Sequence, residues 1–257
     1  ISGGTLQIMP QGLPNTRSHI NIKEGILSFP NGAYDTLFSI YITGGELLIP
    51  AKTEPTTPGA DPERVFVTFS GLVTVSGGAM KIDGILNLQG SLHFLKGSIN
   101  GKGQIQVSSE GSVEVLYDQS PSDQRIVSVS EFYAASAVNI QSPLDLNGNS
   151  NFKLSEDHAL TAKLYGSIAG LGTLILGGKM EVKTLPDFTC TISSNLDNYW
   201  HIDVQPNSKL KLTAPGSKGL YLRETSFITS NTSILSTNTM VGGTISGKNT
   251  IDGDIGI

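Results

Sequence analysis

Residues 97–105 read Gly97-Ser-Ile-Asn-Gly-Lys-Gly-Gln-Ile105, and this pattern returns twice along the chain. The second copy is Gly166-Ser-Ile-Ala-Gly-Leu-Gly-Thr-Leu174, and the third is Gly243-Thr-Ile-Ser-Gly-Lys-Asn-Thr-Ile251. Each copy predicts a short strand, a glycine corner and a second short strand. A chain with this pattern winds as a coil and stacks each turn on the one before. The first two copies lie 69 residues apart, a distance that fits three coils.

Between residues 71 and 116 a glycine opens a new unit every six to eight residues. Units such as Gly84-Ile-Leu-Asn-Leu88 and Gly103-Gln-Ile-Gln-Val107 have apolar residues at their third and fifth positions. This alternation directs one side of each strand inward. We therefore predict that residues 1–257 form a single all-β domain, a right-handed parallel β-helix (β-solenoid) with about 20–25 residues per coil and a few long loops.

A meander of antiparallel hairpins is the competing architecture. Such hairpins favour Asn-Gly or Asp-Gly turns, and several of those found here belong to the glycine repeat itself, which favours the solenoid. The expected loops are residues 10–17, 50–62, 117–125 and 183–201. Residues 130–137 are the only segment with helical character, for one or two turns at most.

The composition excludes several classes of function. The formal charge is -5, from 17 Lys+Arg and 22 Asp+Glu, so we expect no nucleic-acid partner. Apolar segments are too short to insert in a membrane. Cys190 is the only cysteine, which excludes an internal disulfide and leaves a buried apolar role or intermolecular pairing. Low charge and a start within the repeat at Ile1 indicate a fragment of a larger secreted or cell-surface protein.

No catalytic motif emerges from the polar residues. A polysaccharide hydrolase or lyase would bring several aspartates together in one groove, whereas a non-enzymatic module would scatter them. The chain contains no Asp-Asp, Gly-His-Gly or Arg-x-Lys, and its four histidines lack metal-site spacing. We predict no catalytic residue, metal ligand or cofactor. The aspartates to be examined are Asp83, Asp145, Asp203, Asp252 and Asp254.

The best candidate for contact with a partner is the segment Asp197, Asn198, Tyr199, Trp200 and His201, which contains the only tryptophan. Aromatic rings beside amide and carboxylate groups suit stacking on sugars or anchoring a protein, so glycans and host or cell-surface proteins are the expected partners. The alternative is a structural role, in which these large side chains cover apolar edges of the solenoid.

The recurrent Gly-[Ser/Thr]-Ile-x-Gly-x-Gly-x-[Ile/Leu], together with Gly4-Thr-Leu-Gln-Ile8 and Gly25-Ile-Leu-Ser-Phe29, resembles the passenger domains of bacterial autotransporters and other β-helical adhesins of the pectin-lyase-like superfold. This resemblance implies a non-enzymatic extracellular or cell-surface module for adhesion, display or assembly. Self-association through the open ends of the solenoid fits that role. The alternative is a β-helix that binds or degrades polysaccharides, such as a lyase, a hydrolase or a phage tailspike fragment.

Overall fold

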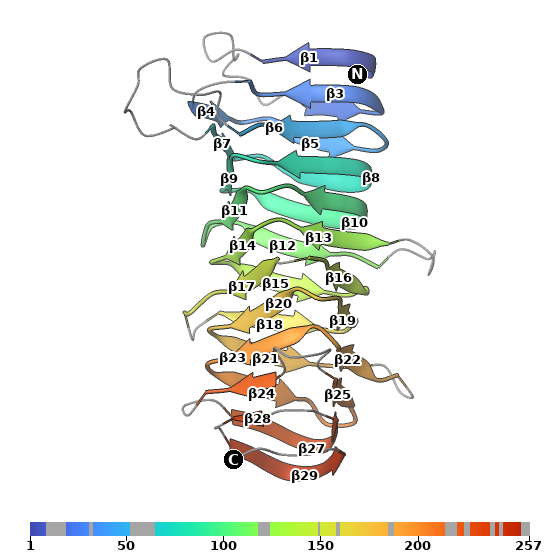
Figure 1. The fold of residues 1–257 in the computed structure, drawn as a ribbon, viewed down its shortest axis with the longest axis vertical. Coiled ribbons are helices and arrows are strands. Elements are labelled where there is room, and N and C mark those ends of the chain that lie inside the picture. Colours follow the sequence, from blue (N-terminus) through green and yellow to red (C-terminus); the bar gives the residue numbers. More distant parts are fainter. Residues whose placement is uncertain are drawn as a thin grey trace.

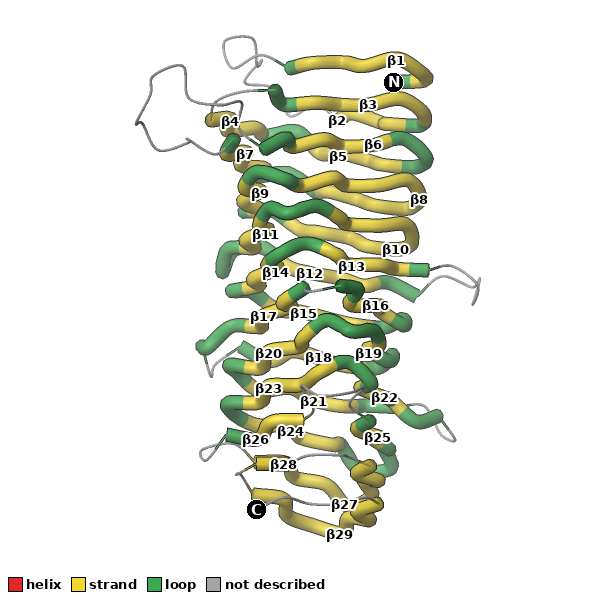
Figure 2. Tube along the Cα trace, in the orientation of Figure 1, coloured by secondary structure: helices red, strands yellow, loops and turns green. Residues whose placement is uncertain are grey.

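The computed structural model describes residues 1–8, 19–30, 33–51, 65–117, 124–148, 150–157, 160–184, 188–213, 220–223, 227–236, 240–241 and 244–252. These residues form strands and short connections without a helix (Figure 2). The strands stack along one long axis, with β1 (Ser2–Gln7) at one end and β29 (Thr244–Asp252) at the other (Figure 1).

Each turn passes through three walls, which we name A, B and C in chain order. Wall C is a 10-stranded sheet, and one 19-stranded sheet covers walls A and B. The strands of wall A alone are β2 (His19–Ile22), β5 (Ser39–Ile42), β12 (Ser112–Val115), β15 (Ala137–Ile140), β18 (Thr161–Leu164), β21 (Lys179–Val182) and β24 (His201–Val204). The strands of wall B alone are β1, β3 (Glu24–Ser28), β6 (Glu46–Ile49), β13 (Arg125–Ser128), β16 (Leu144–Leu146), β19 (Ile168–Ala169), β22 (Cys190–Ile192) and β25 (Leu210–Leu212). The strands that continue around the corner from wall A to wall B are β8 (Val73–Ile82), β10 (Ser91–Asn100), β27 (Phe227–Ser236) and β29. The strands of wall C are β4 (Ala33–Thr36), β7 (Phe66–Phe69), β9 (Ile85–Leu88), β11 (Gln104–Val107), β14 (Glu131–Ala134), β17 (Asn151–Leu154), β20 (Thr173–Leu176), β23 (Asn195–Asn198), β26 (Leu220–Leu222) and β28 (Met240–Val241).

Every strand pair that the structure describes is parallel, which confirms the β-solenoid and excludes the antiparallel meander. On wall A, Val73 pairs with Leu92, Leu92 with Val113 and Val113 with Val138, so these turns contain 19, 21 and 25 residues. The turn from Ile40 to Val73 contains 33 residues because it includes residues 52–64.

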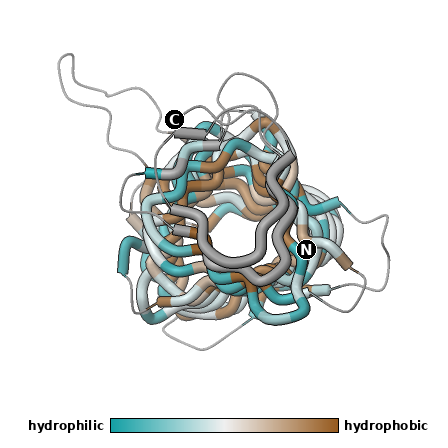
Figure 3. The backbone as a smooth tube through the Cα atoms, turned by 90° about the horizontal axis from the view of Figure 1, so that it is seen from below, coloured by the Kyte–Doolittle hydropathy of each residue, from teal (hydrophilic) through white to brown (hydrophobic). Residues whose placement is uncertain are grey.

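The core is built from inward side chains of all three walls. Figure 3 shows the backbone of successive turns around one axis, coloured by hydropathy. On wall C the register places Leu86, Ile105, Phe132, Phe152 and Leu174 one above another, and all five are buried. The rings of Phe132 and Phe152 lie 4.7 Å apart between centroids. The solenoid is therefore filled by a continuous apolar column, as the sequence alternation predicted.

Glycines of successive turns also stack at the corner between walls A and B. A Cβ on any of the last four members would come within 3.0 Å of the carbonyl oxygen of the preceding member, closer than real Cβ atoms approach. Backbones therefore touch directly at this corner. We name these residues the glycine column: Gly4, Gly25, Gly45, Gly78 and Gly97. The column ends where Gly97 pairs with Arg125, whose side chain is buried.

The first two copies of the repeat turn the corner from wall B to wall C. Gly101 and Gly170 have positive φ angles there, and each faces the carbonyl group of the previous turn. Wall B registers place these copies three turns apart, as predicted. Residues 244–251 of the third copy belong to β29, where Gly247 pairs with Ser230 at the corner between walls A and B. The repeat is therefore a general corner unit that occurs at two different corners.

Two local predictions were wrong. The segment 130–137 contains β14 and begins β15 rather than a helix, because Phe132 and Ala134 both point inward. The segment 183–201 is not one loop, since it contains β22 and β23. Of the other predicted loops, residues 10–17 lie wholly outside the described residues, as do 52–62 of the second and 118–123 of the third.

Candidate functional site

The segment Asp197–His201 turns the corner from wall C to wall A. Asp197 and Asn198 end β23, and His201 begins β24. Alternation along β23 points Leu196 and Asn198 inward and Asp197 outward. The predicted residues are therefore neighbours in space, but they face different environments.

The outward residues form a compact group with the next turn, which we name the tyrosine–arginine cluster: Asp197, Tyr199, Tyr221 and Arg223. Arg223 donates from Nε to Asp197 Oδ1 at 2.7 Å and from Nη2 to Oδ2 at 2.6 Å. Its guanidinium carbon lies 4.8 Å from the ring centroid of Tyr199 and 5.9 Å from that of Tyr221. The Tyr199 hydroxyl donates to Asp197 Oδ2 at 3.2 Å. Bidentate and cation–π contacts thus fix both rings.

The electrostatics of the tyrosine–arginine cluster follow from its one close ion pair. Hydrogen bonding to Asp197 raises the pKa of the Arg223 guanidinium above its ordinary value. Arg223 therefore stays charged at all physiological pH values, and its charge is matched by the carboxylate beside it. The pair is exposed to water on the Arg223 side, so its main effect is to orient the rings rather than to stabilise the fold.

Asn198 and Trp200 shape the corner itself. Asn198 is completely buried, and its Nδ2 donates to the Trp200 carbonyl at 3.3 Å. The Trp200 N–H donates to Asn198 Oδ1 at the same distance, 3.3 Å. The carboxamide of Asn198 therefore satisfies both backbone groups of Trp200. The indole is partly buried at the corner between the two walls.

His201 opens the wall A side of this corner. Burial lowers its pKa below the ordinary 6.5, and Lys179 acts in the same direction while Asp203 opposes it. The neutral imidazole is thus the favoured form near pH 7. A neutral imidazole can accept as well as donate a hydrogen bond.

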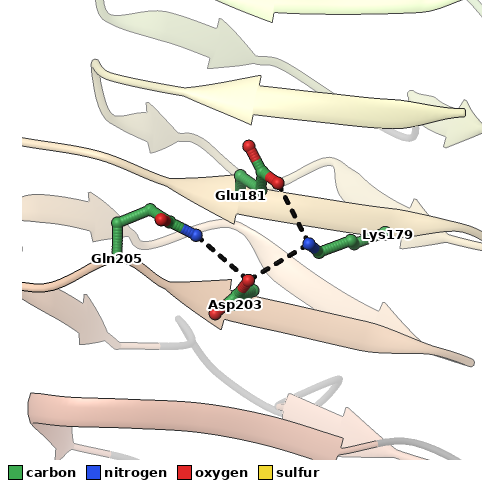
Figure 4. Close-up of polar contacts among 4 residues, drawn as sticks. All are labelled: Lys179, Glu181, Asp203 and Gln205. Carbon is green, nitrogen blue, oxygen red and sulfur yellow. Dashed lines mark hydrogen bonds and ion pairs between the residues drawn. The ribbon is translucent and has the colours of Figure 1, made fainter.

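Next to His201, four polar side chains of β21, β24 and the residue following β24 form a group (Figure 4). Lys179 Nζ lies 3.0 Å from Glu181 Oε1 and 3.1 Å from Asp203 Oδ2. Gln205 Nε2 donates to Asp203 Oδ2 at 3.0 Å. In a glycoside hydrolase the two carboxyl groups flank the scissile bond, whereas here the ammonium group of Lys179 lies between them and contacts both. The arrangement is suited to cross-linking two turns.

The aspartates singled out in the sequence do not converge in the described residues. Asp83 lies at the corner between walls B and C and accepts the N–H of Lys102 at 3.0 Å. Asp145 lies on wall B and Asp203 on wall A. Asp252 ends β29, and Asp254 lies outside the described residues.

The described residues contain neither a candidate metal site nor a candidate membrane-spanning helix. No group of three or more His, Cys, Asp or Glu residues is placed to hold a metal ion in this part of the chain. None of the residues that the structure places forms a helix long and apolar enough to cross a membrane.

Cys190 lines the interior of wall B. The thiol is buried, as one of the two sequence interpretations predicted, and burial raises its pKa to about 12. A thiol in this state is not a nucleophile near neutral pH.

Tyr221 and Arg223 were missed in the sequence. Tyr221 and Arg223 are two positions apart, as Asp197 and Tyr199 are, and Tyr221 pairs with Asp197 on the next turn. This shared spacing is the sequence signal that could have identified them. The sequence pattern does not fix the length of the connection that includes residues 214–219, so it does not predict which residues of the two turns pair.

No protein-family model matches the chain, and neither a curated protein nor a solved structure matches it. The structure confirms the parallel β-solenoid that the resemblance implies, and no family assignment follows from the comparisons.

Proposed function

We propose that the chain is a non-enzymatic structural and adhesive module of the autotransporter-passenger or adhesin type, displayed outside the cell as part of a larger protein. The observation that carries this proposal is the pairing of outward charges between neighbouring side chains. Lys179 binds acidic groups of its own and the next turn, and Arg223 binds Asp197 of the preceding turn. These contacts fix the orientation of outward side chains, which favours a preordered display surface.

The low charge of the surface supports the same function. Charged residues make up 15% of the chain, so hydroxyl and amide groups cover much of the outside. Such a surface suits contact with glycans or with cell-surface proteins at short range. Self-association through the solenoid ends belongs to the same proposal, because the end strands of a solenoid offer unpaired backbone groups.

A polysaccharide-degrading β-helix is the second candidate. Glu181 and Asp203 are direct register partners on adjacent strands, and they are the acidic pair that such an enzyme would use. The ammonium group of Lys179 weighs against it, because it lies between the two carboxylates, where the scissile bond of a substrate would have to lie. The non-enzymatic module is therefore the better supported of the two.

The decisive experiment measures polysaccharide cleavage. The purified chain is incubated with cellulose, xylan and polygalacturonate, and the release of new reducing ends is followed with size-exclusion analysis of the polymers. We expect no cleavage above that of heat-denatured protein. Cleavage that disappears in Glu181→Gln and persists in Glu114→Gln, a matched change on wall A, would overturn the proposal.

A further inference from the structure

The outward side chains of wall C form a continuous strip along the solenoid axis. Strand register places one of them directly above the next, from β11 through β14, β17, β20 and β23 to β26. Adjacent members are about 4.8 Å apart along the axis, the spacing of paired strands. We name these residues the wall C strip: Gln106, Tyr133, Lys153, Ile175, Asp197 and Tyr221.

The charges in and beside this strip are compensated locally. Lys153 Nζ lies 2.8 Å from Glu156 Oε1 and 5.6 Å from the ring centroid of Tyr133. Asp197 is paired with Arg223. A strip whose charges are already paired gives little attraction to an anionic polymer or to nucleic acid, which bind through uncompensated positive charge.

The strip also lacks the apolar centre of a protein interface. Ile175 is its one aliphatic member, whereas the fully buried core of a protein interface is predominantly apolar. The other members of the strip are two tyrosine rings, one amide, one ammonium and one carboxylate group. A neutral polysaccharide matches this chemistry, because each sugar offers hydroxyl groups for hydrogen bonds and a C–H face for an aromatic ring.

Two rings of the tyrosine–arginine cluster are accessible and held in place. Tyr199 is 44% exposed and Tyr221 is 36% exposed. Arg223 contacts both rings, and Asp197 accepts hydrogen bonds from Arg223 and from the Tyr199 hydroxyl. Since these side chains are ordered before a ligand arrives, binding costs little side-chain entropy.

We propose that wall C and its corner with wall A bind a neutral polysaccharide chain lying along the solenoid axis, with Tyr221 of the wall C strip and Tyr199 of the corner stacking on its sugar rings. Arg223 and Asp197 are positioning residues for the two tyrosines. This inference rests on the proposed adhesive function and assigns to it a face, a ligand class and two contact residues.

The test is a co-sedimentation assay of the full chain with microcrystalline cellulose, chitin and insoluble β-1,3-glucan. Polygalacturonate-coated beads serve as the anionic comparison. We expect binding to at least one neutral polysaccharide, unchanged when NaCl is raised from about 0.1 M to about 1 M, because ionic attraction is screened over that range. Tyr199→Ala and Tyr221→Ala should each weaken it by at least about fivefold.

Two further variants separate stacking from other effects. Tyr199→Phe should retain binding, because it keeps the ring. Tyr165→Ala is the matched control, since Tyr165 is 40% exposed but follows β18 at the corner between walls A and B. Circular dichroism of each variant checks that the β-structure is intact.

Three results would overturn the inference: no binding to any neutral polysaccharide, salt-sensitive binding to polygalacturonate alone, or binding that Tyr165→Ala weakens as much as the wall C changes. None of these results bears on the proposed function, which is overturned by polysaccharide cleavage that disappears in Glu181→Gln and persists in Glu114→Gln.

Discussion

The glycine column predicts that two chemically identical substitutions will have very different costs. Gly78 has a φ of 68°, and a Cβ there would meet the backbone of Gly45 in the preceding turn. Gly148 has a nearly equal φ of 64°, but its Cβ would meet only Ser128 Oγ, at an ordinary 3.6 Å. Gly78→Ala and Gly148→Ala therefore have the same backbone strain. They differ because only the methyl group at position 78 would collide with the backbone of the preceding turn.

The expected magnitudes follow from these two contributions. An alanine in the left-handed region costs about 1–2 kcal/mol, of which about 0.4–1 kcal/mol is offset by the reduced freedom of the unfolded chain. Gly148→Ala should therefore lower the free energy of unfolding by about 1 kcal/mol. At Gly78 the turn must also move to accommodate the methyl group, and overpacking of this kind adds about 1–3 kcal/mol.

Urea unfolding followed by far-UV circular dichroism measures the difference. The urea concentrations at the unfolding midpoints of the two variants are compared. The comparison holds where both transitions have the same slope against urea concentration, because a solenoid need not unfold in a single step. We expect a clearly lower midpoint for Gly78→Ala. Equal midpoints would show that direct backbone contact at this corner does not contribute to stability.

Three further predictions concern the core and the titratable groups. Phe152→Ala removes a ring stacked on Phe132 and should cost about 3–5 kcal/mol of unfolding free energy, measured by urea titration. Cys190 should resist maleimide at pH 8 until denaturant is added, because burial raises its pKa to about 12; rapid labelling of the folded chain would contradict its burial. Because burial lowers the folded-state pKa of His201, the stability that its neutral form contributes is complete above the unfolded value near 6.5 and decreases as the pH falls below it. An NMR titration midpoint for His201 above 6.5 would reverse that sign.

Much of the fold was predictable because its determinants are local. Alternation within units such as Ile85–Leu88 and Gln104–Val107 identifies the inward side chains, and glycine marks the corners between them. The register between one turn and the next was harder to predict from the sequence, because the number of residues in a turn varies with the length of its connections. This is why the third copy of the repeat occupies a different corner from the first two.

The candidate site was predictable only in part for the same reason. Asp197 and Tyr199 were found from their own segment, whereas Tyr221 and Arg223 come from the following turn. The burial of Asn198 had a signal in the sequence, because it lies two positions after Leu196 on the inward side of a strand. Its tie to the Trp200 backbone depends on corner geometry, which alternation does not specify.

The end of the glycine column at Gly97 also limits where this protein tolerates added length. Within the column, β8 and β10 run around the corner between walls A and B without a break, and touching backbones leave no room for extra residues. Beyond it, residues 116–124, 183–189 and 205–209 connect the same two walls. A foreign epitope grafted into residues 183–189 should leave the fold intact, whereas the same graft at Gly78 should prevent the chain from folding. At this corner, added length is therefore expected in those three connections rather than beside the glycine column or within the continuous strands β27 and β29.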